Sequence, residues 1–78
     1  MPTILRASGF AIMIYTDDHR PMHVHVWHQG NEAVFEFEGE IHIHENFGMN
    51  RSQMRTALRL VEDNLDMLRT EWKRIHES

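Results

Sequence analysis

Hydrophobic and polar residues alternate along the first half of the chain, and a helical repeat follows in the second half. The apolar run Phe10–Tyr15 (FAIMIY) ends at two aspartates, and short apolar runs next to turn residues are typical of buried strands. In His23–His28 (HVHVWH) apolar and polar positions alternate, which indicates a strand with two unlike faces. Residues 16–22 connect the two strands as a loop, because Pro21 disfavours helix there.

Two further strands are predicted downstream. The triplet Gln29-Gly30-Asn31 is typical of a hairpin turn, and Ala33–Glu38 (AVFEFE) then forms the returning strand. Gly39 marks the next turn. The segment Glu40–His44 (EIHIH) alternates again, so we expect its two isoleucines to face inward and its two histidines to face outward.

After Asn50 the apolar residues recur at steps of four and three, which is the repeat of an amphipathic helix. Asn50 and Gln53 have the spacing of a capping box. The predicted helix Arg51–Ile75 is roughly 38 Å long, whereas a domain of this size is roughly 30 Å across. We therefore expect it to bend or break near Asp63-Asn64, or to pack its end on another chain. The apolar stripe consists of Met54, Leu58, Val61, Leu65, Leu68, Trp72 and Ile75.

These elements predict one α+β domain over residues 1–78: a three- to four-stranded, mainly antiparallel sheet with a long C-terminal helix packed across one face. A chain of 78 residues is too short for an enzyme with a deep dinucleotide cleft. It contains no cysteine, which excludes disulfides, zinc ribbons and thiol catalysis. No apolar segment approaches 18 residues and no signal peptide is evident, so we expect a cytoplasmic protein without membrane contact.

Charge is divided unevenly along the chain. Residues 1–50 hold two arginines against seven carboxylates, and residues 51–78 hold six basic and five acidic side chains. An acidic half does not favour nucleic-acid binding, but it suits a protein partner of opposite charge. Arg51, Arg55 and Arg59 form a basic stripe on the predicted helix. They and Trp72 are the candidate partner-binding residues, with a solvated helix face and a core position as the alternatives.

Six of the seven histidines lie in the middle of the chain. Residues i and i+2 of a strand face the same side, about 6.5–7 Å apart, so His23 and His25 point into one volume, with His19 and the carboxylate of Asp17 or Asp18 just before them in the chain. Imidazole and carboxylate groups together are typical ligands of a divalent metal such as Zn²⁺ or Ni²⁺. His42 and His44 form a second candidate pair. The alternative for either pair is a solvated sheet face, where histidine is acceptable.

The same segment also supports an enzymatic hypothesis. Cleavage of RNA without metal needs a general acid, a general base and a cation for the phosphate. His23 and His25 are the candidate acid–base pair, His19 can substitute for either, and Arg20 is the candidate phosphate ligand. The negative charge of this half opposes an RNA substrate. The alternative for Arg20 is an ion pair with Asp18 that orders the loop.

Three segments carry a resemblance to a known family. They are the opening Met1-Pro2-Thr3-Ile4-Leu5-Arg6, the string Asp18-His19-Arg20-Pro21-Met22-His23-Val24-His25-Val26, and Leu60-Val61-Glu62-Asp63-Asn64 followed by Trp72. Together they resemble the small bacterial and archaeal proteins known as domain of unknown function 4160, over nearly the whole chain. Two features depart from that pattern. Met22 replaces a second proline, and the histidines at 42 and 44 are additional.

The resemblance implies a part in a pair of proteins and does not indicate a specific chemical reaction. Members of that family often resemble one half of a small gene pair in a toxin–antitoxin-like arrangement. We therefore expect a small cytosolic partner-binding protein, whose partner is a small protein encoded beside it or a second copy of itself. The alternative is a histidine-based ribonuclease or a metal-binding enzyme that uses the His19–His25 segment.

Overall fold

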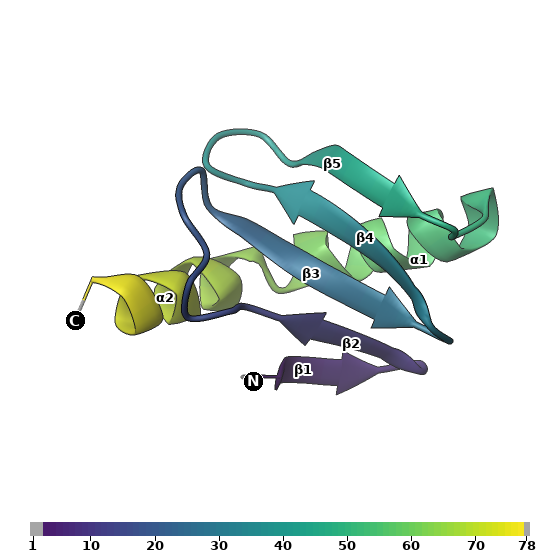
Figure 1. Cartoon of the computed structure of the whole chain (residues 1–78), viewed down its shortest axis with the longest axis horizontal. Helices are drawn as coiled ribbons and strands as arrows, with labels where there is room; N and C mark the ends of the chain where they lie inside the picture. The colour runs from purple at the N-terminus through teal and green to yellow at the C-terminus, as the bar shows by residue number, and fades with distance from the viewer. Residues whose placement is uncertain (1–2, 78) are drawn as a thin grey trace.

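The computed structural model describes residues 3–77, in which five strands precede two helices (Figure 1). The strands are β1 (Thr3–Ala7), β2 (Phe10–Met13), β3 (His23–His28), β4 (Asn31–Glu36) and β5 (His42–Phe47), and the helices are α1 (Arg51–Asp63) and α2 (Leu65–His76). The strands form one antiparallel sheet in chain order. The predicted α+β class is confirmed, but the sheet has five strands where three or four were predicted, and two helices replace the single long one.

The additional strand is β1, which pairs with β2 across a two-residue turn. Ser8 and Gly9 in this turn have φ angles of 54° and 78°, the left-handed values of a type I′ hairpin. The Ser8-Gly9 dipeptide is a turn signal that could have located this strand. The predicted hairpin between β3 and β4 has the same construction, with positive φ at Gln29 and Gly30.

Strand β5 forms one edge of the sheet, and its register with β4 shifts between Val34 and Phe35. All six of its residues are exposed. Ile43 pairs with the core residue Phe35 and so lies on the predicted face, but it is 52% exposed and is not buried there. The edge has no further strand to cover it, and α1 packs on β4 instead. Ile41, just before β5, does pack against the core.

The helical segment begins with the predicted capping box. The side chain of Asn50 accepts from the Gln53 N–H at 2.8 Å, and the Gln53 side chain accepts from the Asn50 N–H at 2.9 Å. The helix breaks at Asn64, whose Nδ2 donates to the Leu60 carbonyl at 2.8 Å. The longest extent of the molecule is 35 Å, less than the roughly 38 Å of a straight helix over this segment. The break keeps both halves on the sheet.

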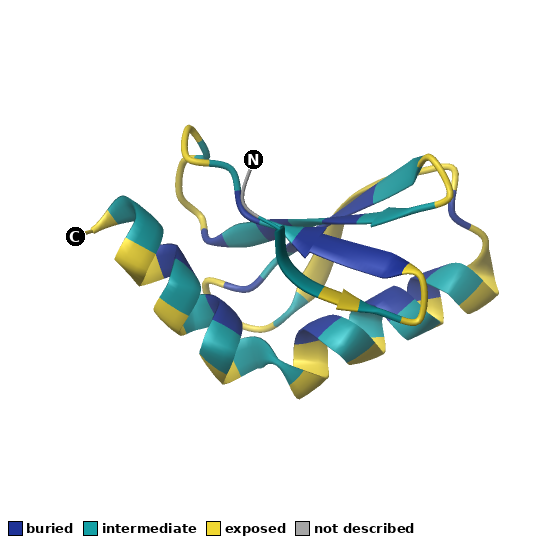
Figure 2. Cartoon of the chain, turned by 90° about the horizontal axis from the view of Figure 1, so that it is seen from below, coloured by how far each residue is buried: buried dark blue, intermediate teal, exposed yellow. Residues whose placement is uncertain are grey.

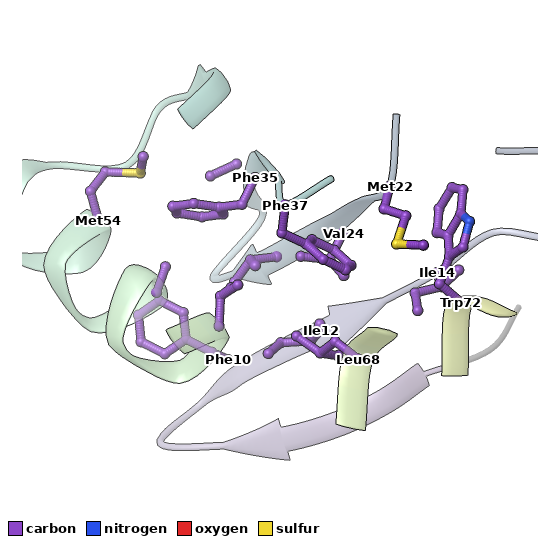
Figure 3. Close-up of a cluster of buried hydrophobic side chains, with 14 of the residues drawn as sticks. Phe10, Ile12, Ile14, Met22, Val24, Phe35, Phe37, Met54, Leu68 and Trp72 are labelled. Carbon is purple, nitrogen blue, oxygen red and sulfur yellow. The ribbon is translucent and has the colours of Figure 1, made fainter. Parts of the chain in front are cut away.

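Both helices lie on the same side of the sheet (Figure 2). The core lies between the helices and the sheet (Figure 3). It holds apolar side chains of the inner strands and of the helical stripe, among them Val24, Phe35, Leu68 and Trp72. Trp72 is 1% exposed, so its side chain lies in the core and does not offer a surface to a partner. Among residues 3–77 no helix is both long and apolar enough to span a membrane.

Candidate metal centre

The loop between β2 and β3 presents Asp18 to the strand that follows it. The Tyr15 N–H donates to Asp18 Oδ2 at 3.0 Å, and the Asp18 N–H donates to the Tyr15 carbonyl at 3.1 Å. This reciprocal pair is the local side chain-to-backbone bonding that aspartate favours in turns. It fixes the carboxylate and leaves Oδ1 free to face β3.

The structure brings Asp18, His23 and His25 together. Asp18 Oδ1 lies 3.3 Å from His23 Nε2 and 3.2 Å from His25 Nε2. One ligand atom from each residue lies within 4.8 Å of the other two. The three side chains are largely shielded, with exposures of 10%, 17% and 15%. The alternation of β3 is the cause, since Val24 points into the core and its two neighbours point to the opposite face.

The other nitrogen of each ring contacts an acceptor. His23 Nδ1 donates to the Pro21 carbonyl and His25 Nδ1 donates to Glu32 Oε2, both at 2.8 Å. Glu32 was not singled out in the sequence. Its signal is the hairpin register, because Trp27 pairs with Glu32 and His25 pairs with Val34, which makes Glu32 a diagonal neighbour of His25.

Aromatic rings pack around the two imidazoles. The Tyr15 ring lies 4.2 Å from the His25 ring, and its hydroxyl accepts from Trp27 Nε1 at 3.0 Å. On the other side, the Trp72 ring lies 5.3 Å from the His23 ring. These contacts restrict the orientation of both histidines, which favours a preorganised site.

The candidate residues His19 and Arg20 do not join the cluster. His19 is exposed, and Arg20 donates to Glu38 at 2.6 Å and also to Glu77. The Met22 N–H, together with Arg20, lowers the pKa of Glu38, and the hydrogen bonds to Glu38 and Glu77 raise the pKa of Arg20. Arg20 thus ties the end of the loop to the end of α2.

The second histidine pair shares a single carboxylate. His42 Nε2 lies 2.7 Å from Glu36 Oε1, and His44 Nδ1 lies 3.2 Å from Glu36 Oε2. The two rings are 61% and 55% exposed. Within residues 3–77, the geometry of three converging ligand atoms is found at Asp18, His23 and His25 and not at this pair.

A groove of about 540 Å³ extends from His23 and His25 to His44 of the second pair. Five of its thirteen lining residues carry a carboxylate, against one arginine and four histidines; the five are Asp17, Asp18, Glu32, Glu36 and Glu45. The basic stripe of Arg51, Arg55 and Arg59 does not line this groove; it lies exposed on α1, and its arginines have no carboxylate within 4.0 Å in the described part of the chain.

The fold and the cluster define a small α+β protein with a histidine–carboxylate site on its open sheet face. The family model described as domain of unknown function (DUF4160) matches residues 9–73. The chain belongs to this family, which confirms the resemblance in its sequence. The opening residues precede the match, and Met1 and Pro2 lie outside the described residues. Searches of the curated proteins and of the solved structures found no match.

Proposed function

We propose that Asp18, His23 and His25 bind a divalent transition-metal ion, with Zn²⁺ or Ni²⁺ as the ions to test. One observation carries this proposal: the Nε2 atoms of both histidines converge on one carboxylate oxygen while both Nδ1 atoms donate elsewhere. A neutral imidazole has one N–H. With Nδ1 as the donor, Nε2 of each ring carries a lone pair aimed at a negatively charged oxygen.

A divalent cation between the three ligand atoms would supply the positive charge that two ring nitrogens and a carboxylate attract, and the spacing agrees with such an ion. Tetrahedral Zn²⁺ with bonds of about 2.0–2.1 Å holds its ligand atoms about 3.3–3.4 Å apart. The distances from Asp18 Oδ1 to the two Nε2 atoms are 3.3 and 3.2 Å, close to that spacing, and all three ligand atoms lie within 4.8 Å of one another.

The partners of the Nδ1 atoms support the same conclusion. Histidines that bind metals usually donate their other N–H to a carbonyl or a carboxylate, which fixes the tautomer and makes the ligand nitrogen more basic. His23 has a carbonyl partner at Pro21 and His25 has a carboxylate partner at Glu32. Each of the two histidines therefore has the outer hydrogen bond that is typical of a metal ligand.

Three protein ligands leave a coordination position for water or substrate, as in catalytic zinc sites. All three residues line the groove, which gives that position a route to solvent. A metal ion held there would act as a Lewis acid and would lower the pKa of a water molecule bound to it. The proposal therefore includes hydrolytic activity of a metal-binding enzyme.

Metal titration of tag-free, chelator-treated protein tests the proposal. We expect isothermal titration calorimetry to give one Zn²⁺ or Ni²⁺ per chain and native mass spectrometry to give the same stoichiometry. Asp18→Asn should lower the affinity at least a hundred-fold, more than the loss of an outer partner costs. Asp17→Asn, one residue away and exposed, is the matched control. Equal binding by both variants would refute this site.

The ribonuclease hypothesis has less support, because carboxylates line the groove and Arg20 is paired with Glu38 and Glu77. It predicts that purified protein cleaves RNA and that His23→Ala abolishes cleavage while thermal unfolding is unchanged. Intact RNA after incubation with and without divalent metals would refute it.

Partner binding is the second candidate function. We propose a small cytosolic protein that acts as one component of a toxin–antitoxin-like gene pair, and the exposure of Ile43 and Phe47 on an edge strand supports it. Co-elution with the protein encoded beside it, in size-exclusion chromatography at micromolar concentration, is the expected result. Two separate peaks would contradict this function.

A further inference from the structure

Strand β5 leaves one side of its backbone without a neighbouring strand in the described sheet. Its six residues are all exposed. Ile43 and Phe47, at 52% and 54%, are the exposed large hydrophobic residues of the described chain. An exposed edge of this kind is a template for an additional strand.

The register of β5 places its side chains on two different faces. Phe47 lies beside Glu32 and Glu45 lies beside Val34 on the groove face, whereas Ile43 lies beside the core residue Phe35 on the helix face. A strand added along this edge therefore meets an acidic groove with one set of alternate side chains. Its other set meets the exposed side chain of Ile43.

At the β5 end of the groove, one carboxylate has no ion-pair partner among the described residues and is free to bind a charged ligand. Glu36 is engaged by two histidines and Glu32 by one. Glu45, in contrast, has no basic group within 4.0 Å in the described part of the chain. Val34, 7% exposed, lies directly beside Glu45, and Phe47 follows along the same face. A long basic side chain fits this combination, because its alkyl stem packs on apolar surface while its charged end reaches a carboxylate.

We propose that β5 accepts an extended basic segment of a partner protein as a sixth strand. Lysine or arginine side chains of that segment enter the groove beside Glu45, and its alternate apolar side chains cover Ile43. The inference rests on the partner-binding function proposed above and specifies the chemistry of the partner. The register shift opposite His44 bends the edge, which restricts regular pairing to a few residues and predicts weak, micromolar binding.

A second copy of the chain fits this edge less well. Pairing of β5 with another β5 brings two Glu45 side chains and two acidic grooves to one interface, and like charges on adjacent strands are destabilising. A basic segment instead neutralises the groove. Charge complementarity therefore selects a partner of different composition.

A labelled seven-residue peptide in which lysine and valine alternate is the probe for this surface. We expect fluorescence anisotropy to show saturable binding that weakens as salt is added. Glu45→Lys should lower the affinity at least tenfold. Glu40→Lys, an exposed substitution of equal charge outside the groove, should leave it within twofold. The same peptide N-methylated at the residues that face β5 should not bind.

Three results would overturn the inference: no saturable binding up to millimolar peptide, equal affinity for a peptide in which glutamate and valine alternate, or equal losses in the two variants. The partner function is tested separately. If the neighbouring gene product co-elutes with the chain and the lysine–valine peptide does not compete, the function stands and this docking surface is refuted. If the peptide binds as expected and no co-elution occurs, the surface stands and the gene-pair proposal is refuted.

Discussion

The chain contains a histidine–aliphatic–histidine motif twice, and the two copies have different surroundings. His23–His25 lies in β3, the central strand of the sheet, where its rings are 17% and 15% exposed and meet three acceptors. His42–His44 lies in the edge strand β5, where its rings are about four times more exposed and share Glu36. Spacing along a strand fixes only the face to which a pair points.

The two copies of the motif differ in the residues that contact their histidines, and these residues come from other parts of the chain. The loop before β3 supplies Asp18, and the next strand supplies Glu32, so the first pair has partners on two sides. Strand β5 has a neighbour on one side only, and that neighbour supplies one carboxylate. In the described part of this chain, three ligand atoms converge where the motif lies in a central strand beside a loop, and not where it lies in the edge strand.

The largest expected difference between the two pairs is in Zn²⁺ affinity, measured after one histidine is removed from either pair in separate variants. His25→Ala deletes a proposed ligand and should lower Zn²⁺ affinity at least a hundred-fold, more than loss of an outer partner costs. His44→Ala should leave the affinity unchanged, because that ring lies outside the cluster. Calorimetric titration of the two variants, after circular dichroism has shown that both are folded, provides the measurement. The opposite ranking would place the metal at the β5 pair.

The carboxylates behind the two pairs provide a finer test. Glu32→Gln should weaken Zn²⁺ binding about 10–100-fold, since it leaves His25 with a neutral outer partner. Glu36→Gln is the matched substitution on the same strand and should have little effect, because its partners are the two β5 histidines. A competition assay with a chromogenic chelator measures both affinities. Similar losses in the two variants would indicate a general charge effect of the groove.

The middle residues of the two motifs differ in their contribution to stability. Val24 is fully buried and Ile43 is 52% exposed. Val24→Ala should lower the free energy of unfolding by about 2–3 kcal/mol through lost burial and a cavity. Ile43→Ala should change it by less than about 0.5 kcal/mol, as is typical of surface positions. Urea denaturation followed by circular dichroism compares them, and equal losses would mean that β5 is covered in solution.

The smallest expected effect concerns Glu38, which holds the loop before β3 in place. That loop supplies Asp18 to the first histidine pair and not to the second. The pKa of Glu38 is lowered from its ordinary value of 4.5 by the Met22 N–H and by Arg20, so its charged form stabilises the fold above that pH. This contribution should disappear as the pH falls below about 4.5. Glu38→Gln keeps the acceptor oxygen but not the charge, and should reduce the dependence of Tm on pH between 6 and 3. An unchanged pH profile would show that the charge of Glu38 adds no stability.

The sequence predicted the parts of the fold that depend on local pattern. The alternation in β3, the Gln29-Gly30 turn and the capping box at Asn50 follow from neighbouring residues. The break at Asn64 was one of two alternatives that the length of the predicted helix left open. Strand β1 was missed because Thr3–Ala7 has only a weak pattern. The exposure of Ile43 could not be predicted, because alternation does not reveal which strand is at the edge.

The candidate site was predictable to the same extent. Asp18, His23 and His25 lie within eight positions of one another, so the loop and the strand suffice to place them together. The tertiary partners of the site were not predicted: Glu32 requires the register of a hairpin, and the packing of Trp72 against His23 requires the docking of α2. The pairing of Arg20 with Glu77 likewise joins residues 57 positions apart. The sequence therefore predicted Arg20 as a phosphate ligand, whereas in the structure it holds the loop to the end of α2.

The aromatic packing around the two histidines gives the chain optical reporters of its own. The protein has two tryptophans. The Trp72 ring lies 5.3 Å from the His23 ring, and Trp27 is bonded to the hydroxyl of Tyr15, whose ring lies 4.2 Å from the His25 ring. An open-shell ion such as Cu²⁺ at the centre would quench both indoles at this range, whereas Zn²⁺, with its filled d shell, would leave their emission bright. Native fluorescence can therefore report occupancy of the site by an open-shell ion without any label.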